Sequence, residues 1–221
     1  MRFSAVWTTC VLVAALGLYG QGQNTESKSA PVNEVKGTPP RATPGDYQAH
    51  AQAGTVTVGA EFMGHSVPRL EGPLSTEDYV VVETGLYGAP GVQIKVSLED
   101  FSLRINGKKK TALPSQSYVL VTKSLKDPSW VPPEPAEPKS KSSLGTGGQG
   151  DSPPPAPVHV PFELRRAMAL HVRRSSMPVG EHALPEAGLL FFQYRGKTES
   201  IHSIELIYAG PAGEATLNLQ P

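Results

Sequence analysis

Short segments in which apolar and polar residues alternate recur along the chain, and this two-residue period restricts its fold more than any other feature. In residues 92–97, VQIKVS, the apolar Val92, Ile94 and Val96 alternate with polar residues. Residues 100–105, DFSLRI, repeat the pattern. Strands with one face on a core and one face in water have this period. The sequence therefore predicts a sheet protein.

Further segments have the length and composition of β-strands, and two of them contain the runs YVVV and LLFFQY. YVVV is apolar on both faces and suits a central strand, whereas LLFFQY is either central or presents an apolar patch, and we favour core packing for Phe191 and Phe192. The short turn AGPAGE is typical of a hairpin between the last two segments. The further strand segments are residues 55–63, 78–88, 117–125, 188–196, 200–210 and 214–221.

One segment, residues 161–174, fits two kinds of element. Alternation of Met168, Leu170 and Val172 would suit a strand, but Pro161 stands where a helix tolerates proline, at its start. We expect one short helix here.

Residues 128–160 interrupt the strand pattern with proline clusters around a Ser/Gly-rich centre. Such a composition is typical of extended and flexible chain, as a linker between two domains or as a long loop within one. The strands after it are too few to form a stable domain alone. We therefore predict an all-β fold, an immunoglobulin-like β-sandwich of about eight strands spanning residues 54–221, with a disordered Pro/Gly/Ser-rich insert at 128–160.

The N-terminal residues resemble an export signal followed by a spacer. Met1-Arg2, an apolar run from Ala5 to Tyr19 and the small residues after it predict a signal peptide at residues 1–22. An uncleaved N-terminal anchor is the alternative and the only membrane contact that we expect. Residues 23–53 are polar and contain prolines, so they are predicted to be a disordered tether. The protein is expected to be secreted or periplasmic.

Cysteine content and charge exclude several classes of function. Cys10, the only cysteine, lies inside the apolar run, so the exported chain would have no disulfide, thiol nucleophile or zinc-binding thiolate. The 20 Lys and Arg residues equal the 20 Asp and Glu residues in number. A chain without net charge has no global field to attract nucleic acid, so we expect none as a partner.

The stretch YVVVETGLYGAPGVQIKVSLEDFSLRINGK resembles secreted bacterial immunoglobulin-like domains of the DUF4352 kind. The resemblance lies in a Tyr-Val-x-Val strand, a second strand and an Asp-Phe-x-Leu pattern before a turn. It implies an extracytoplasmic, non-enzymatic sandwich and carries over no site residue. The chain departs from this pattern in its proline-rich insert and in lacking a lipoprotein cysteine.

The stretch INGKKK is the first candidate site. Asn-Gly is a strong turn signal, and charge at Lys108, Lys109 and Lys110 would keep the end of a strand in solvent. A basic cluster also suits an anionic partner, and a second basic group follows later in the chain. We favour the solvated turn and keep anion or partner contact at the lysines as the alternative. The second group consists of Arg165, Arg166, Arg173 and Arg174.

The stretch EFMGH is the second candidate site. On a straight strand Glu61, Met63 and His65 would point to one face, and thioether with imidazole suits copper. Gly64 would bend the strand and no similar cluster repeats the pattern. Met63 and His65 therefore remain weak candidates for a metal site.

Enzymatic motifs are missing from the sequence. It has no Gly-x-Ser-x-Gly elbow, no His-Glu-x-x-His pair and no Gly-rich phosphate loop. We therefore expect a non-enzymatic protein without a cofactor, an exported binding or scaffolding module of the cell envelope. It would contact a protein partner through a sandwich face or the Pro-rich insert. A copper- or anion-binding envelope protein is the alternative.

Overall fold

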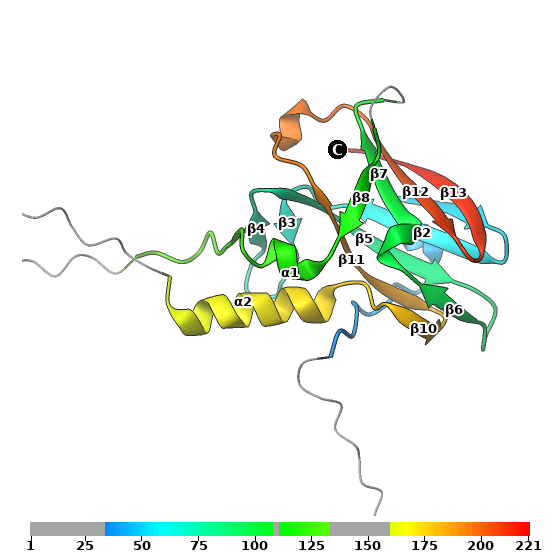
Figure 1. Ribbon diagram of the computed structural model, residues 1–221, viewed down its shortest axis with the longest axis horizontal. Helices are drawn as coiled ribbons and strands as arrows, with labels where there is room; N and C mark the ends of the chain where they lie inside the picture. Colours follow the sequence, from blue (N-terminus) through cyan, green and yellow to red (C-terminus); the bar gives the residue numbers. More distant parts are fainter. Residues whose placement is uncertain (1–33, 108–110, 133–159) are drawn as a thin grey trace, which may run out of the picture. The chain divides into compact units, whose positions relative to one another are not determined.

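Antiparallel strands dominate the computed structural model, which describes residues 34–107, 111–132 and 160–221 (Figure 1). These residues fall within one unit, residues 33–221. The strands are β1 (Ala49–Ala53), β2 (Val56–Phe62), β3 (Ser66–Val67), β4 (Leu74–Thr76), β5 (Tyr79–Tyr87), β6 (Gln93–Val96), β7 (Phe101–Ile105), β8 (Leu113–Gln116), β9 (Leu125–Lys126), β10 (Gly180–Ala183), β11 (Glu186–Gln193), β12 (Ile204–Gly210) and β13 (Gly213–Leu219). The helices are α1 (Tyr118–Val121) and α2 (Phe162–Ser175), with single 3-10 turns η1 (Pro44–Asp46), η2 (Leu98–Asp100) and η3 (Thr198–Ser200).

Eight strands form one sheet in the order β1-β2-β5-β11-β8-β7-β12-β13. The sheet folds over so that β1 and β13, at the two ends of this order, contact each other. Only two residue pairs, Phe191 with Gln116 and Phe192 with Ser115, join β11 to β8. This short pairing lets the sheet bend there, and the two halves face each other as a sandwich that is nearly closed into a barrel.

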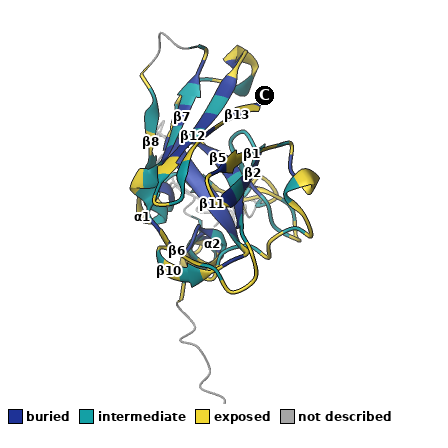
Figure 2. Cartoon of the chain, turned by 90° about the vertical axis from the view of Figure 1, so that its right-hand side faces the viewer, coloured by how far each residue is buried: buried dark blue, intermediate teal, exposed yellow. Residues whose placement is uncertain are grey.

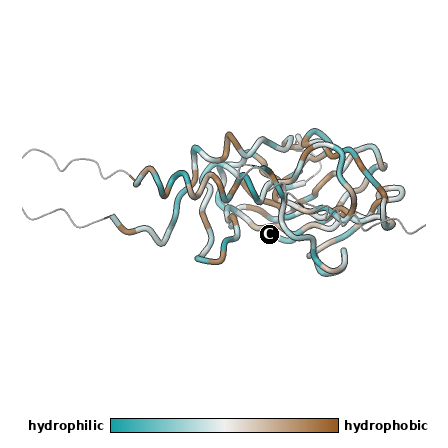
Figure 3. Tube along the Cα trace, turned by 90° about the horizontal axis from the view of Figure 1, so that it is seen from below, coloured by the Kyte–Doolittle hydropathy of each residue, from teal (hydrophilic) through white to brown (hydrophobic). Residues whose placement is uncertain are grey.

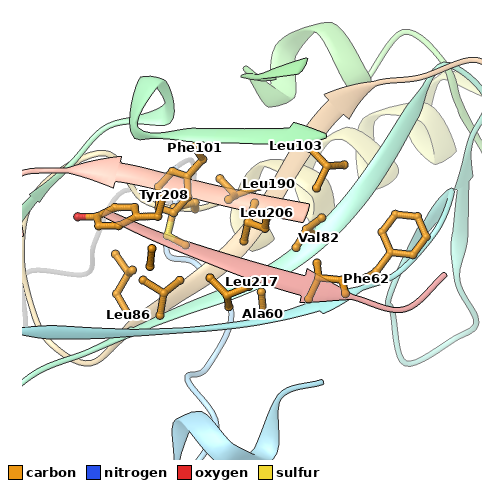
Figure 4. Packing of buried hydrophobic residues seen from close by; sticks show 14 of the residues in the cluster. Ala60, Phe62, Val82, Leu86, Phe101, Leu103, Leu190, Leu206, Tyr208 and Leu217 are labelled. Carbon is orange, nitrogen blue, oxygen red and sulfur yellow. The ribbon is translucent and has the colours of Figure 1, made fainter. Parts of the chain in front are cut away.

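The main core lies between these two halves. Side chains of β2, β5 and β11, such as Val82 and Leu190, face those of β7, β12 and β13, such as Leu103, Leu206 and Leu217 (Figure 4). All five are at most 2% exposed. Burial of each such side chain contributes about 2 kcal/mol, so this interior is the main source of stability for a chain without disulfides.

A second layer covers the outer face of β5 and β11. Helices α1 and α2 and the small sheet β3-β4-β9 pack over this face. Both strands are therefore buried on both sides, as their dark blue colour in Figure 2 shows. Neither described helix has the length and hydropathy of a membrane span. The second core consists of Val67, Leu74, Tyr79, Val81, Val121, Met168, Val172, Leu189 and Phe191.

The predicted all-β sandwich is confirmed, and so is the helix predicted at 161–174, which is α2. The runs YVVV and LLFFQY lie in the central strands β5 and β11, and Phe191 and Phe192 belong to the two cores. The β12–β13 hairpin forms at the predicted AGPAGE turn. The predicted signal peptide and residues 133–159 of the predicted insert lie outside the described residues.

The strand predicted at 117–125 is wrong, because its first half is the helical turn α1. Ser117 accepts a hydrogen bond from the backbone N–H of Val119 at 3.4 Å and so caps this turn. Val121 is fully buried in the second core. A helical turn reverses the chain between β8 and β9, which belong to different sheets, and this need overrides the β-preference of the run YVLV.

The disordered tether predicted at 23–53 is also wrong for its described part, since β1 and η1 lie within it. Ala49, Ala51 and Ala53 face the core, and Tyr47 is only 5% exposed. The folded domain therefore begins before residue 54. Residues 23–33 of the predicted tether lie outside the described residues.

Tyr47 packs onto a pair of glycines that face each other across β2 and β5, Gly59 and Gly85. A Cβ on Gly59 would lie 2.7 Å from the Tyr47 ring, and a Cβ on Gly85 would lie 2.5 Å from its hydroxyl. Only glycine leaves room for the ring at these two positions. We call residues 34–48 the N-terminal strap.

Arg41 attaches the strap to the sheet by two carboxylates. Its guanidinium lies 2.6 Å from Glu61 and 2.7 Å from Glu83, which sit directly opposite each other on β2 and β5. Burial alone would lower the pKa of Arg41, but its hydrogen bonds to Glu83 and Glu61 raise it. The guanidinium also lies 4.4 Å from the centre of the Tyr47 ring, a cation–π contact. Arg41 therefore neutralises a like-charge pair within the sheet.

Gly85→Ala is expected to destabilise the protein by about 1 to 3 kcal/mol, because the new methyl group collides with Tyr47. The measurement is chemical denaturation followed by circular dichroism. In a Tyr47→Ala background the same substitution should cost less, and the remaining cost comes from the Tyr87 ring, which lies 2.9 Å from the same Cβ position. Equal costs in both backgrounds would show that the glycine serves something other than the tyrosine ring.

Arg41→Ala is expected to lower the free energy of unfolding by about 2 kcal/mol, because Glu61 and Glu83 then repel each other without a counter-ion. Adding Glu83→Gln should recover part of this loss. Arg195→Ala is the control, since Arg195 pairs with Asp78 but is 72% exposed, and it should cost less than about 0.5 kcal/mol. No recovery by Glu83→Gln would contradict the proposed neutralisation.

Candidate functional site

In the turn INGKKK the structure describes the residues before the three lysines. Asn106 and Gly107 have φ angles of 60° and 98°, the left-handed backbone that the Asn-Gly turn requires. The Asn106 side chain donates to the Ser200 carbonyl at 2.9 Å and accepts from the His202 N–H at 2.7 Å. Lys108, Lys109 and Lys110 lie outside the described residues, so their contact with an anion or partner stays a prediction.

The structure does not place Glu61, Met63 and His65 on one strand face. Strand β2 ends at Phe62, and Gly64 has a φ angle of 61°, which turns the chain. Glu61 pairs with Arg41, whereas Met63 packs beside the second core. Met63 and His65 both line a wide hollow of about 550 Å³.

Both ring nitrogens of His65 face backbone carbonyl oxygens. Nδ1 lies 2.8 Å from the Tyr79 oxygen, and Nε2 lies 2.9 Å from the Gly196 oxygen. A metal ion would have to replace one of these contacts. Among the described residues no group of three or more His, Cys, Asp or Glu side chains is placed to hold a metal. A copper site at Met63 and His65 stays a prediction that this geometry does not favour.

A more enclosed hollow lies over the outer edge of β11, and we call it the groove. Its volume is about 360 Å³, within the usual range for ligand pockets. Leu189 and Phe191 of β11 form its floor. Its walls come from the strap, η2, the β8–α1 junction and the segment between α2 and β10. The further lining residues are Glu34, Val35, Leu98, Gln116, Ser117, Tyr118, Ser176, Met177, Pro178, Val179 and His182.

The groove forms because two segments, β8 and residues 176–177, pair with the same edge of β11 and do not meet along that edge. β8 pairs with β11 only at Phe191 and Phe192. On the other side of the gap, Ser176 bridges to Leu189, and the Met177 N–H donates to the Leu189 carbonyl at 3.0 Å. The groove lies between these two contacts, and its lining includes Leu189 and Phe191, which are each 1% exposed.

The groove is lined mainly by apolar side chains, and its serines serve the backbone. The Ser176 hydroxyl donates to the Val172 carbonyl at 2.6 Å, and the Ser117 hydroxyl accepts from Val119. Val179, a lining residue, is 58% exposed, and Val119 and Leu120, which follow the lining residue Tyr118 in α1, are 52% and 41% exposed. The apolar lining is thus open to solvent at Val179.

An imidazole and a carboxylate flank one wall. Nδ1 of His182 lies 3.7 Å from Oε2 of Glu186, and Nε2 of His182 is buried without a hydrogen-bond partner. Burial raises the pKa of Glu186, although the Ala187 N–H and His182 act in the opposite direction. Ionised Glu186 is therefore less favourable in the folded protein than in the unfolded chain.

The sequence analysis did not predict the groove. Two features of the sequence can be related to it only once the structure is known. The apolar residues of YVLV exceed what one buried position, Val121, requires, so Val119 and Leu120 are left exposed. The segment MPV, residues 177–179, has no strand or helix period. Neither signal shows that these segments meet above β11.

Comparisons of the chain with known protein families, with characterised proteins and with solved structures give no match. The groove is therefore interpreted from its own geometry.

Glu186→Gln is expected to change how stability depends on pH. Because the pKa of Glu186 is raised on folding, its favourable contribution is complete below the unfolded carboxyl pKa of about 4 and is lost as pH rises through the folded pKa. The glutamine variant lacks this loss. The difference in unfolding free energy between variant and wild type, measured by denaturation over a pH series, should therefore grow in favour of the variant as pH rises. A pH-independent difference would contradict the raised pKa.

Proposed function

We propose that this protein is an exported, non-enzymatic binding module of the cell envelope, and that the groove holds an apolar segment of a protein partner. The observation that supports this most is that the apolar lining includes Val179, which is 58% exposed, while the exposed Val119 and Leu120 directly follow the lining residue Tyr118 in α1. Contiguous exposed apolar surface is typical of interaction sites.

The groove is backed by rigid structure, which favours binding. Leu189 and Phe191 on its floor belong to the second core and are each 1% exposed. A preformed site loses little conformational entropy when a partner binds. An extended peptide with one or two apolar side chains matches a volume of about 360 Å³.

The chemistry of the lining supports binding rather than catalysis. Ser117 and Ser176 hydrogen-bond to backbone groups, and a hydrolytic serine would instead need a base within reach of its hydroxyl. Export, the resemblance to DUF4352 domains and a role for the Pro-rich insert rest on the sequence alone and belong to the same proposal.

The alternative, a copper- or anion-binding envelope protein, has less support. Both nitrogens of His65 are engaged with carbonyl oxygens, and the lysines at 108–110 lie outside the described residues. The groove therefore carries the proposal.

A photo-crosslinking residue at Val179 is expected to capture one defined protein from the native envelope fraction. The same residue at Leu70, which is fully exposed in the turn between β3 and β4, is the matched control and should not capture it. The captured protein is then purified, and its affinity is measured for Val179→Asp and Leu70→Asp. The first variant should bind at least about tenfold more weakly and the second should bind like the wild type.

Two outcomes would contradict the groove as the binding site. One is equal capture from Val179 and Leu70, which indicates nonspecific adhesion. The other is a captured partner whose affinity does not change in Val179→Asp although this variant folds, as judged by circular dichroism.

A further inference from the structure

Helix α2 has one buried face and one open face. Met168 and Val172 are 3% and 0% exposed, and Leu164 packs beside them against the second core. The helical period places Phe162, Arg166 and Leu170 on the opposite side, and the exposed Arg165 lies on the flank next to Phe162. Seen from the side on which α2 lies, hydrophobic and hydrophilic residues alternate along this helix (Figure 3).

Positive charge is concentrated on α2 although the chain has no net charge. The helix contains four arginines and one acidic residue, Glu163. Within the described part of the chain, Arg165 and Arg166 are exposed and make no ion pair or side-chain hydrogen bond. Nε of Arg173 is buried without a partner. The guanidinium groups of Arg165 and Arg166 are therefore available to anions.

Exposed apolar side chains accompany this charge. Phe162 at the start of α2 is 66% exposed, and Val131 is 78% exposed. The start of α2 and the segment that ends at residue 132 lie at the same end of the described domain (Figure 1). The same end thus combines unpaired arginines with an unburied aromatic ring.

This combination matches the surface of an anionic bilayer. Guanidinium groups bind phosphate oxygens in bidentate geometry, and an aromatic ring gains free energy by entering the apolar side of the headgroup layer. A soluble acidic polymer would satisfy the arginines but would leave Phe162 in water. The charge and the exposed ring together therefore favour a lipid surface.

We propose that the outer face of α2 docks on an anionic membrane surface, with Arg165 and Arg166 binding lipid phosphates and Phe162 inserting between headgroups. This surface is separate from the groove and does not depend on the function proposed for it. Docking of this face does not require a membrane-spanning helix.

The experiment uses the full chain with Cys10→Ser, which frees it of its own thiol. An environment-sensitive fluorophore is attached to a cysteine introduced by Phe162→Cys. In the control it is attached through Asn218→Cys, at an exposed position on β13. Fluorescence is followed during titration with vesicles of phosphatidylglycerol and phosphatidylcholine, or of phosphatidylcholine alone. A rise is expected only at position 162 and only with the anionic vesicles. The local label separates docking of α2 from any membrane contact of the N-terminal residues.

Removal of charge tests the arginines. With the label at position 162, Arg165→Gln/Arg166→Gln should raise the half-saturating lipid concentration about 30-fold. Each basic residue near an anionic surface strengthens binding by roughly the same factor, and the double variant removes two of them. Lys95→Gln/Lys197→Gln removes the same charge from exposed positions outside α2 and should leave the titration unchanged.

Three results would overturn the proposal. The first is no fluorescence rise at position 162, and the second is an equal rise with phosphatidylcholine alone. The third is an equal loss in both charge variants, which indicates dependence on net charge only. Binding of polyglutamate-like polyanions that requires the arginines, without a signal at position 162, would assign the face to an acidic polymer instead.

Discussion

The antiparallel pairing of β5 with β11 is the interaction on which the rest of the structure depends. It runs over eight residue pairs, from Glu186 with Leu86 to Gln193 with Tyr79. One face of the pair supplies Val82 and Leu190 to the interior, and the other face supplies Val81 and Leu189 to the second core. Because both faces are apolar, both must be covered. The folded-over sheet covers one face, and the layer of α1, α2 and β3-β4-β9 covers the other.

The N-terminal strap is held by polar and steric features that supplement this apolar core. Gly59 and Gly85 leave a flat area on the sheet for the Tyr47 ring, and Arg41 neutralises two glutamates that would otherwise repel each other. Together they specify where the strap crosses β2 and β5, and one of its residues, Val35, then completes a wall of the groove.

The second layer carries the molecule's two candidate contact surfaces. Between β8 and the Ser176–Leu189 bridge the second layer leaves the groove, which is apolar and preformed. The outer side of α2 faces solvent with Phe162, and Arg165 and Arg166 beside it are exposed. The groove suits a protein segment and the helix face suits a charged lipid surface, so the two proposals concern different partners and different ends of α2.

The sequence by itself determined the long strands β2, β5, β11, β12 and β13, the helix at 161–174 and, with a single cysteine, the lack of an intrachain disulfide, because periodicity and residue type act locally. Tertiary structure decided what depends on meetings between distant segments. The alternating alanines of β1 became a strand only because β2 lay beside them, the strand-like run at 117–125 turned helical because the chain had to change sheets, and His65 turned towards two carbonyl oxygens rather than towards Met63. The groove was unpredictable for the same reason: its floor, walls and rim come from five separate stretches of the chain, and no local pattern records which of them will become neighbours.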